Sequence, residues 1–346
     1  MNKKIVGGIA TVLVGVGLYK LISTQRNGNQ SAVQEKWTVA NMPDLTGKVI
    51  IVTGANSGIG FEAAKAFARK GAQTILACRS MDKAQAALTE IQAAIPNAPA
   101  EIMALDLASL DSVRQFAGAF KAKYDRLDVL VNNAGIMMVP YGITEDGFER
   151  QLGTNHLGHF ALTGLLMDLL LNTPGARVVN ISSGGHRFGE MDFDNLMFEG
   201  GEGYSPMGAY GRSKLANLLF TYELQRRFDA IGAGALATAA HPGISQTNLT
   251  AHIENRWYFK LFKPLMPLLL QSAAMGALPT LRAAVDPEAT GGEYFGPDGT
   301  REQRGYPVRV EASDAAHNAA DAHRLWQVSE RLTGVAYLEP EKEYGR

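Results

Sequence analysis

From Thr46 onward, short apolar runs alternate with segments of helical character. The runs are 48–53, 72–78, 100–107, 128–135, 176–183, 234–241 and 292–295. The helical stretches between them include 58–70, 82–95 and 109–124, and helical sequence continues to about residue 171. Apolar strands that alternate with helices form a parallel sheet covered on both faces. The alternation therefore predicts one α/β domain over 46–346, with a doubly wound parallel sheet of about seven strands.

The first apolar run leads directly into a glycine-rich turn, "TGANSGIG", at residues 53–60. Gly54, Gly58 and Gly60 permit a tight turn and a close approach of the backbone to a pyrophosphate. The helix that follows points its N-terminus at the same anion. An ordinary glycine turn is the alternative, but its place between a strand and a helix favours a Rossmann-type dinucleotide site.

The end of the second run bears on which dinucleotide binds. An acidic residue there commonly bonds the ribose hydroxyls of NAD, but "LACRS" places Arg79 at this point. An arginine attracts a 2′-phosphate, so NADP(H) is favoured over NAD(H). A solvated arginine is the alternative interpretation. We expect Asp82 in the first helical turn, and Asp106 is a candidate for the adenine amino group or an ordinary turn residue.

Polar and small residues end the next runs. The fourth run ends in "NNAG" (132–135) and the fifth in "NISS", with Ser182 and Ser183. Tyr210 and Lys214 lie four positions apart, and therefore on one face of a helix. A phenol beside an ammonium can act as an acid whose pKa the positive charge lowers.

These motifs together resemble the short-chain dehydrogenase/reductase family. The resemblance covers residues 46 to about 300 through TGxxxGxG, NNAG, a serine after the fifth strand, YxxxK and the Pro-Gly of "HPG" (241–243). It implies that Tyr210 is the general acid/base and that Lys214 lowers its pKa and holds the nicotinamide ribose. It also implies that Ser183 bonds the substrate oxygen and that Asn155 holds a water connected to the lysine.

The resemblance also implies a set of cofactor contacts along the carboxyl edge of the sheet. Thr247 would bond the carboxamide, and Gly135 and Ile244 would offer backbone contacts. The full set expected to bind the cofactor is Gly54, Asn56, Ser57, Gly58, Ile59, Gly60, Arg79, Asp106, Leu107, Asn133, Ala134, Gly135, Tyr210, Lys214, Pro242, Gly243, Ile244 and Thr247.

Ser183 and Tyr210 are 27 positions apart, which is longer than in many short members of the family. The longer insertion resembles the retinol dehydrogenase-like branch, as do "LACR", "SKLAN" and "GGEYFGPDG". The choice of Ser183 over Ser182 rests on this resemblance.

An apolar segment, "IENRWYFKLFKPLMPLLL" (253–270), follows the Pro-Gly. In the family this part of the chain, about 250–275 here, covers the substrate. An apolar cover suits a retinoid, a steroid or a long-chain aldehyde, and suits contact with a bilayer surface. A core helix or a homodimer contact is the alternative.

The N-terminus has an uncharged run from Ile5 to Tyr19. Counted through Ile22, with the Lys20 side chain snorkelling to the interface, the segment has eighteen residues, near the lower limit for a helix that spans a bilayer. No small-x-small cleavage site follows, so we favour a membrane anchor within 1–28 over a signal peptide or a buried helix. Residues 29–45 are expected to form a linker. Lysines flank the run on both sides, so the orientation of the anchor in the membrane is poorly specified. The single cysteine of the chain fits a reducing compartment, and we expect the catalytic domain on the cytoplasmic side.

Composition excludes several partners and sites. The chain carries 33 Lys and Arg against 34 Asp and Glu, without a basic run, so no nucleic-acid partner is expected. His156 and His159 are spaced for a shared metal ion, but no Cys or carboxylate completes the set, so no metal is expected.

We predict an NADP(H)-dependent oxidoreductase for an alcohol or carbonyl. A catalytically silent nucleotide-binding regulatory protein of the same fold is the alternative.

Overall fold

A computed structural model describes residues 36–245 and 271–338 of the 346-residue chain. Three expectations from the sequence fall outside these ranges. They are the anchor within 1–28, the cofactor contact of Thr247, and the substrate cover up to residue 270. The described residues belong to the second of two units of the chain, which begins at Lys36.

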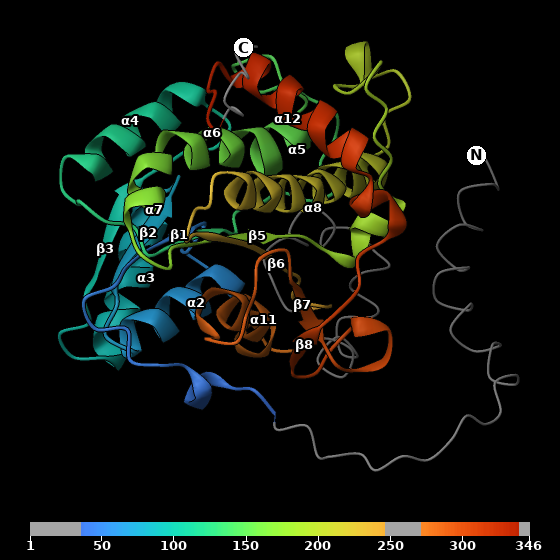
Figure 1. Cartoon of the computed structure of the whole chain (residues 1–346). Coiled ribbons are helices and arrows are strands. Elements are labelled where there is room, and N and C mark those ends of the chain that lie inside the picture. Colours follow the sequence, from blue (N-terminus) through green and yellow to red (C-terminus); the bar gives the residue numbers. More distant parts are fainter. Residues whose placement is uncertain (1–35, 246–270, 339–346) are drawn as a thin grey trace, which may run out of the picture. The chain divides into compact units, whose positions relative to one another are not determined.

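An eight-stranded sheet runs through the middle of the described unit (Figure 1). The strand order is β3-β2-β1-β4-β5-β6-β7-β8, and the first seven strands in this order pair in parallel. The strands are β1 (Val49–Thr53), β2 (Gln73–Cys78), β3 (Ala100–Ala104), β4 (Val129–Asn132), β5 (Arg177–Ile181), β6 (Leu236–Ala240), β7 (Tyr294–Pro297) and β8 (Pro307–Arg309).

The expected α/β class and the seven parallel strands are confirmed, but the expected strand number was one too low. The eighth strand, β8, has three residues and pairs antiparallel with β7 through Phe295, Gly296 and Pro297. A strand of three residues that begins with a proline is too short to show the alternation of apolar and polar residues that predicts a strand. Proline is tolerated because β8 is an edge strand, where its missing N–H removes no ladder bond.

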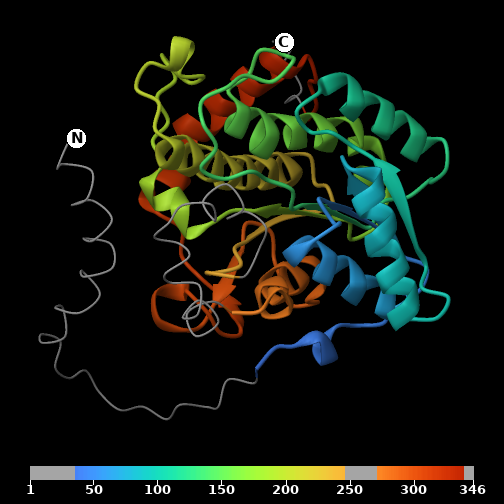
Figure 2. The ribbon, with the colours of Figure 1, turned by 180° about the vertical axis from the view of Figure 1, so that it is seen from behind.

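Helices cover both faces of the sheet (Figures 1 and 2). One face carries α2 (Gly58–Arg69), α3 (Met81–Ala94) and α11 (Ala273–Val285). The opposite face carries α4 (Leu110–Lys121), α5 (Arg150–Leu152), α6 (Gly158–Leu165), α7 (Met167–Asn172), α8 (Pro206–Ala230) and α12 (Ala319–Thr333). Short helical turns η1 (Val39–Asn41), η2 (Gly153–Leu157), η3 (Gly184–Phe188), η4 (Glu199–Gly201), η7 (Thr300–Glu302) and η8 (Asp314–His317) connect them.

The central strands bury both faces because successive side chains point to opposite sides. In β1, Ile50 and Val52 pack in the apolar cluster with α2 and α11, whereas Val49 and Ile51 pack in the cluster with α4, α6 and α8. Full burial of each such side chain contributes about 2 kcal/mol. A continuous apolar run is therefore what a central parallel strand requires.

The helix α8 begins where its sequence carries a strong start signal. The Ser205 side chain accepts a hydrogen bond from the Gly208 N–H, and Pro206 occupies the first helical turn, where its missing N–H is harmless. The first two turns of α8 consequently lie beside the end of β5. Tyr210 and Lys214 reach the carboxyl edge of the sheet from there.

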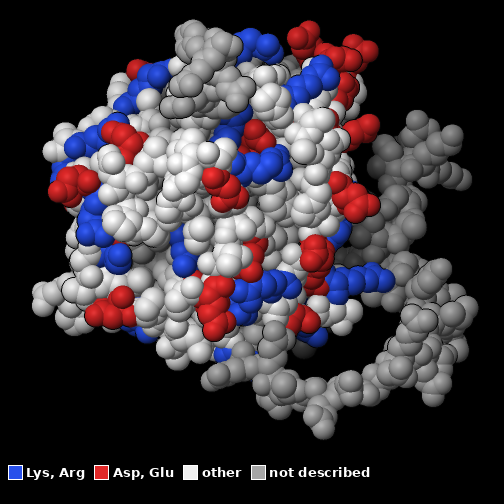
Figure 3. Space-filling view, in the orientation of Figure 1, with Lys and Arg blue, Asp and Glu red and all other residues white. Residues whose placement is uncertain are grey.

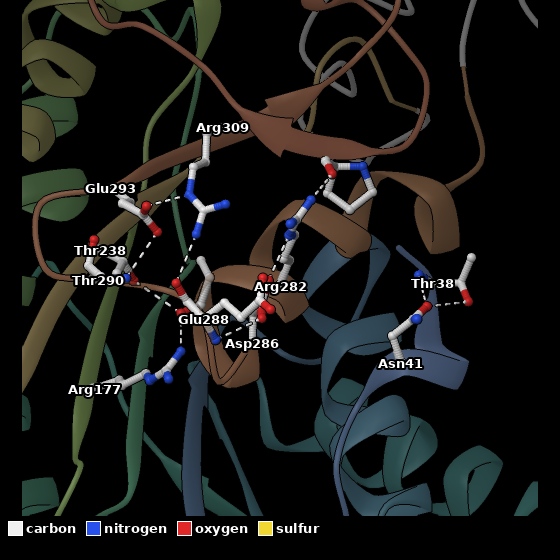
Figure 4. Close-up of polar contacts among 12 residues, drawn as sticks. Thr38, Asn41, Arg177, Thr238, Arg282, Asp286, Glu288, Thr290, Glu293 and Arg309 are labelled. Atoms are coloured by element: carbon white, nitrogen blue, oxygen red, sulfur yellow. Dashed lines mark hydrogen bonds and ion pairs between the residues drawn. The ribbon is translucent and has the colours of Figure 1, made fainter. Parts of the chain in front are cut away.

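Ion pairs stabilise the connection between α11 and β8, away from that edge (Figure 4). Arg282 pairs with Asp286 one turn later at 2.8 Å, and Arg309 pairs with Glu293. The half-buried Arg177 guanidinium donates to the Ala283 carbonyl at 3.2 Å. These contacts fix β7 and β8 against the rest of the sheet.

Positive and negative side chains are interspersed on the face seen in Figure 3. None of the helices within 36–245 and 271–338 has the length and hydropathy needed to span a bilayer. The proposed anchor lies in residues outside these ranges.

Residues 36–45, which we expected within a linker, pack on the domain instead. Trp37, Met42 and Leu45 are buried in the apolar cluster that contains α2 and α11. The Lys70 ammonium donates to the Met42 carbonyl at 2.6 Å, which fastens the segment to the end of α2. The folded unit therefore starts at Lys36, ten residues before the boundary expected at residue 46.

If residues 36–45 belong to the folded unit, Trp37→Ala should destabilise it. Removing a buried indole leaves a cavity, so the free energy of unfolding in urea should fall by about 3 kcal/mol. Lys36→Ala, which removes only a cation–π contact with Tyr306, should lower it by less than about 1 kcal/mol. Equal effects of the two variants would show that the segment adds no core.

Candidate active site

A cleft of about 340 Å³ opens at the carboxyl ends of β1 to β6. Its place follows from the strand order, which reverses at β1: β2 and β3 lie on one side of β1, and β4, β5 and β6 lie on the other. Ligands of such sheets bind at this reversal, beyond the carboxyl ends of the strands. The lining contains the expected cofactor residues Gly54, Asn56, Ser57, Gly58, Ile59, Gly60, Arg79, Asp106, Leu107, Asn133, Ala134, Gly135, Tyr210, Lys214 and Pro242. The sheet thus brings together residues that are far apart in the sequence.

The glycines of the first turn occupy backbone conformations and spaces that other residues would disturb. Gly54 and Gly58 have φ values of 67° and 58°, in the left-handed region. A Cβ atom at Gly60 would lie 2.4 Å from the Asn133 amide nitrogen and 2.7 Å from the Gly54 carbonyl oxygen. The glycine spacing is therefore required by the turn itself, before any ligand is considered.

The N-terminus of α2 faces this cleft without a side-chain cap. Ser57 is the N-cap residue, but its hydroxyl accepts no hydrogen bond from the first turn. The turn residues Ser57, Gly58, Ile59 and Gly60 all line the cleft. Free N–H groups and the positive end of the helix dipole together suit a phosphate.

Two basic side chains line the same end of the cleft. The Arg79 side chain is 71% exposed, and its guanidinium lies 3.9 Å from the Asp106 carboxylate, a distance too long for a hydrogen bond. Lys83, which the sequence motifs did not single out, also lines the cleft from the first turn of α3. Asp106 in addition accepts a hydrogen bond from the Ala108 N–H at 3.0 Å.

The end of β4 is held by side chains buried beneath it. The Thr53 hydroxyl lies 2.9 Å from the backbone nitrogens of Asn133 and Ala134, and 2.9 Å from Nε2 of His159. The Asn133 amide donates back to the Thr53 carbonyl at 2.7 Å. These bonds fix "NNAG" against the glycine turn and explain why amides end this strand.

Lys214 is buried at the inner wall of the cleft. Its ammonium donates to the Ile181 carbonyl at 3.0 Å, and its side chain has no acidic partner among the hydrogen bonds and ion pairs of the described residues. Burial alone lowers the pKa of Lys214 to about 8, because a charged amine loses its hydration there. A Cβ atom at Gly135 would lie 3.4 Å from this ammonium, so a larger residue would crowd it.

Tyr210 lies beside Ser183, at the end of β5. Burial raises the pKa of the Tyr210 phenol, and hydrogen bonding with the Ser183 side chain partly offsets that increase. We expected Lys214 to lower this pKa. The pKa of Tyr210 is raised instead, because burial dominates; the Lys214 ammonium lies 5.9 Å from the ring centroid.

Asn155 lies in the π-helical turn η2, where a helix widens by one residue. Its amide bonds both backbone groups of Ile136: Nδ2 donates to the carbonyl at 2.9 Å, and Oδ1 accepts from the N–H at 2.8 Å. Nδ2 also donates to the Ser213 hydroxyl, which in turn donates to the Tyr210 carbonyl at 2.8 Å. Ser213 thus links Asn155 to α8, a role that no motif indicated.

The two serines after β5 have different partners. The Ser182 hydroxyl donates to the Lys214 carbonyl at 2.9 Å, which leaves Ser183 as the serine beside Tyr210. Ile244 is expected to offer a backbone contact to the cofactor, and its N–H donates to the Gln303 carbonyl at 2.7 Å. Gly243 has a φ of 62° and packs against the same carbonyl, so this turn is fastened to the β7–β8 loop.

The two histidines spaced for a metal ion serve separate parts of the core. Nε2 of His156 lies 2.9 Å from the Ser329 hydroxyl on α12, whereas His159 faces Thr53. Burial lowers their pKa values to about 3 and about 4, so both are neutral. Within the described ranges, no three His, Cys, Asp or Glu side chains are placed to hold a metal ion.

The chain is similar to known oxidoreductases over most of its length. The family model for short chain dehydrogenase matches residues 48–256. Retinol dehydrogenase 12 of Mus musculus is 41% identical over 295 residues, which are 85% of this chain and 88% of the relative. Retinol dehydrogenase 13 of Homo sapiens is 42% identical over 296 residues, with 84% and 86% covered.

A solved structure of an uncharacterized protein from Mycobacterium Paratuberculosis shares the fold. It superposes with a TM-score of 0.72 at 41% sequence identity, and the match covers 87% of this chain and 99% of that one.

The buried Lys214 ammonium should reduce the stability of the nucleotide-free protein below pH 8. Its pKa falls from 10.5 in the unfolded chain to about 8, so replacing it by Lys214→Met should stabilise the fold by up to about 3 kcal/mol at pH 7. The Ile181 carbonyl keeps its bond from Asn217 at 3.0 Å. The gain should decline between pH 8 and 10.5, where the folded wild type becomes neutral first.

Urea unfolding of both proteins at pH 7 and pH 9.5 measures this effect. The exposed pair of Lys121 and Asp168 provides the control, because Lys121→Met should change stability by less than about 1 kcal/mol at either pH. A Lys214→Met variant that is less stable than wild type at pH 7 would contradict a cost of burying the Lys214 ammonium.

Proposed function

The chain belongs to the short-chain dehydrogenase family, and on that premise we propose that it interconverts an alcohol and a carbonyl by hydride transfer with NADP(H). The observation that carries the proposal is that Tyr210 and Lys214 line the inner wall of the cleft, while the Ser183 side chain is hydrogen-bonded to the phenol of Tyr210. A phenol and a hydroxyl in contact offer two donors to one substrate oxygen.

The cleft fits a dinucleotide from its phosphate end to its reactive end. The uncapped N-terminus of α2 and the glycine turn would hold the pyrophosphate. Lys214, at the inner wall, would hold the nicotinamide ribose. When bound, the nicotinamide supplies the hydride in reduction or accepts it in oxidation.

Proton transfer is the task of Tyr210. In reduction its phenol donates a proton to the substrate oxygen while the Ser183 hydroxyl donates a hydrogen bond to the same oxygen. The raised pKa of Tyr210 keeps the phenol protonated at pH 7. Lys214, whose pKa is about 8, is mostly charged at that pH and would stabilise the tyrosinate left after transfer.

We assign the 2′-phosphate of NADP(H) to the basic end of the cleft. Arg79 is exposed there with only a 3.9 Å ion pair to Asp106, and Lys83 lines the same wall. Two cations near one phosphate favour NADP(H) over NAD(H), which has only a hydroxyl at this position.

An apolar substrate is favoured by the relatives named retinol dehydrogenases and by the apolar segment 253–270 of this chain. Phe188, in the turn that follows Ser183, is 72% exposed, and Ile244 after the Pro-Gly is 46% exposed. A retinoid, a steroid and a long-chain aldehyde all fit this description. An anchor within residues 1–28 would hold the domain at the membrane in which such substrates dissolve.

The test is NADPH oxidation, followed by absorbance, with a panel of retinoid, steroid and aliphatic aldehyde or ketone substrates. Turnover of at least one apolar carbonyl supports the proposal. The alternative, a nucleotide-binding regulatory protein without turnover, would bind NADPH and oxidise none of it with any member of the panel.

Tyr210→Phe should lower turnover at least hundredfold and leave NADPH affinity within twofold, because only the proton donor is removed. Steady-state kinetics and fluorescence titration of NADPH measure the two quantities. Tyr222→Phe, on the same helix but stacked on His317, should retain wild-type turnover. Turnover of Tyr210→Phe within tenfold of wild type would assign the proton donor elsewhere.

Arg79→Asp should weaken NADPH binding far more than NADH binding. Loss of a charge-assisted bond and gain of a repulsive carboxylate should shift the preference by about 3 kcal/mol, more than a hundredfold. Dissociation constants for both cofactors measure it. Arg69→Asp, at the far end of α2, makes the same charge change outside the cleft and should leave the ratio unchanged. An equally unchanged ratio in Arg79→Asp would place the 2′-phosphate elsewhere.

A further inference from the structure

The turn that follows β5 determines where the Ser183 hydroxyl points. The Gly185 N–H donates to that hydroxyl at 3.1 Å, and the His186 N–H donates to the Ser183 carbonyl at 3.0 Å. Gly185 also packs tightly on the phenol: a Cβ atom there would lie 2.9 Å from Cε1 of Tyr210. A small shift of this turn would therefore move Ser183 relative to Tyr210.

The imidazole of His186 connects this turn to a distant part of the chain. The residue is 1% exposed, and Nδ1 lies 2.6 Å from the Ser183 carbonyl oxygen. On the other side of the ring, Nε2 lies 3.1 Å from the backbone nitrogen of Ser313. Ser313 follows β8 and precedes η8, 127 positions further along the chain.

Only one protonation state of His186 satisfies both contacts. A carbonyl oxygen can only accept, so Nδ1 must carry a hydrogen; a backbone N–H can only donate, so Nε2 must be bare. The ring is therefore neutral and in the Nδ1–H tautomer. A protonated ring would place two donors, Nε2–H and the Ser313 N–H, against each other.

The surroundings of the ring favour the neutral form. Burial is the main cause that lowers the pKa of His186, and Arg187 and His241 lower it further, whereas the Ser183 carbonyl and Glu302 act in the opposite direction. The Tyr294 ring packs edge-on at 5.9 Å between centroids. The Glu302 carboxylate is engaged with His241 at 3.0 Å and Arg187 at 3.6 Å, so it does not compete for His186.

We propose that His186 is a positioning residue, which holds Ser183 against Tyr210 by joining the Ser183 carbonyl to the backbone amide of Ser313. The inference rests on the proposed function, because Ser183 is given its role there. It extends that function by making the segment after β8 a support of the substrate-side serine. His186 itself touches neither the cleft lining nor the phenol among the contacts described.

Ser313 allows a variant that removes one hydrogen bond and little else. Its φ of −69° is the value that proline requires, and no other hydrogen bond of its N–H is found among the described residues. Its buried hydroxyl has no hydrogen-bond partner in the described structure. Ser313→Pro thus deletes the donor to His186, and Ser313→Ala, which keeps the N–H, is the matched control.

We expect Ser313→Pro to lower kcat about tenfold to hundredfold with NADPH affinity within twofold of wild type, because a misplacement of about 1 Å has effects of this size. Ser313→Ala should keep wild-type kcat. At the other end, His186→Asn keeps a donor toward the Ser183 carbonyl and should retain more turnover than His186→Leu. A purely structural role would instead lower thermal stability and NADPH affinity together in both histidine variants.

Crystal structures of Ser313→Pro and Ser313→Ala provide a readout that needs no turnover. The Ser183 hydroxyl should be displaced from Tyr210 by about 1 Å in the proline variant and not in the alanine variant. An undisplaced hydroxyl in Ser313→Pro, or a wild-type kcat in that variant, overturns the inference. A wild type that reduces no carbonyl refutes the proposed function, and the two crystal structures then still decide whether His186 positions Ser183.

Discussion

The geometry of the candidate site depends on a buried lysine that has no carboxylate partner within residues 36–245 and 271–338. Lys214 reaches the end of β5 from α8 and is held there by the Ile181 carbonyl. Its neighbours are packed accordingly: a Cβ atom at Gly135 would lie only 3.4 Å from the Lys214 ammonium and 3.1 Å from Oδ1 of Asn155. A charge kept in a low-dielectric site at the expense of stability is typical of a functional group.

The sheet places the parts of the site and the loops align them. The carboxyl ends of β1, β2 and β3 bring the glycine turn, Arg79 and Asp106 to one end of the cleft. Those of β4, β5 and β6 bring "NNAG", the serine turn and the Pro-Gly to the other. Loops from the C-terminal part then fasten these ends, as Gln303 does for Ile244 and Ser313 for His186.

Much of this could be predicted from the sequence, because the relevant signals are local. Seven strands are apolar runs, and the glycine turn and YxxxK have fixed spacing. What was missed depends on contacts between distant residues. Lys83, Ser213 and His186 belong to no motif that signals their contacts, β8 is too short to show a period, and burial reverses the direction expected for the pKa of Tyr210. Trp37 lies in a segment expected to be a linker, and its burial depends on contacts with a core formed by residues distant in the sequence.

The central claim is hydride transfer between NADP(H) and an apolar carbonyl, with the proton supplied by Tyr210. The most direct measurement uses NADPH deuterated at both C4 positions, all-trans-retinal or a long-chain aldehyde as substrate, and mass spectrometry of the alcohol formed. The account predicts one deuterium on the carbinol carbon for every NADPH oxidised by wild type, and loss of that product in Tyr210→Phe. Alcohol without deuterium, or deuterated alcohol at the wild-type rate in Tyr210→Phe, would contradict it.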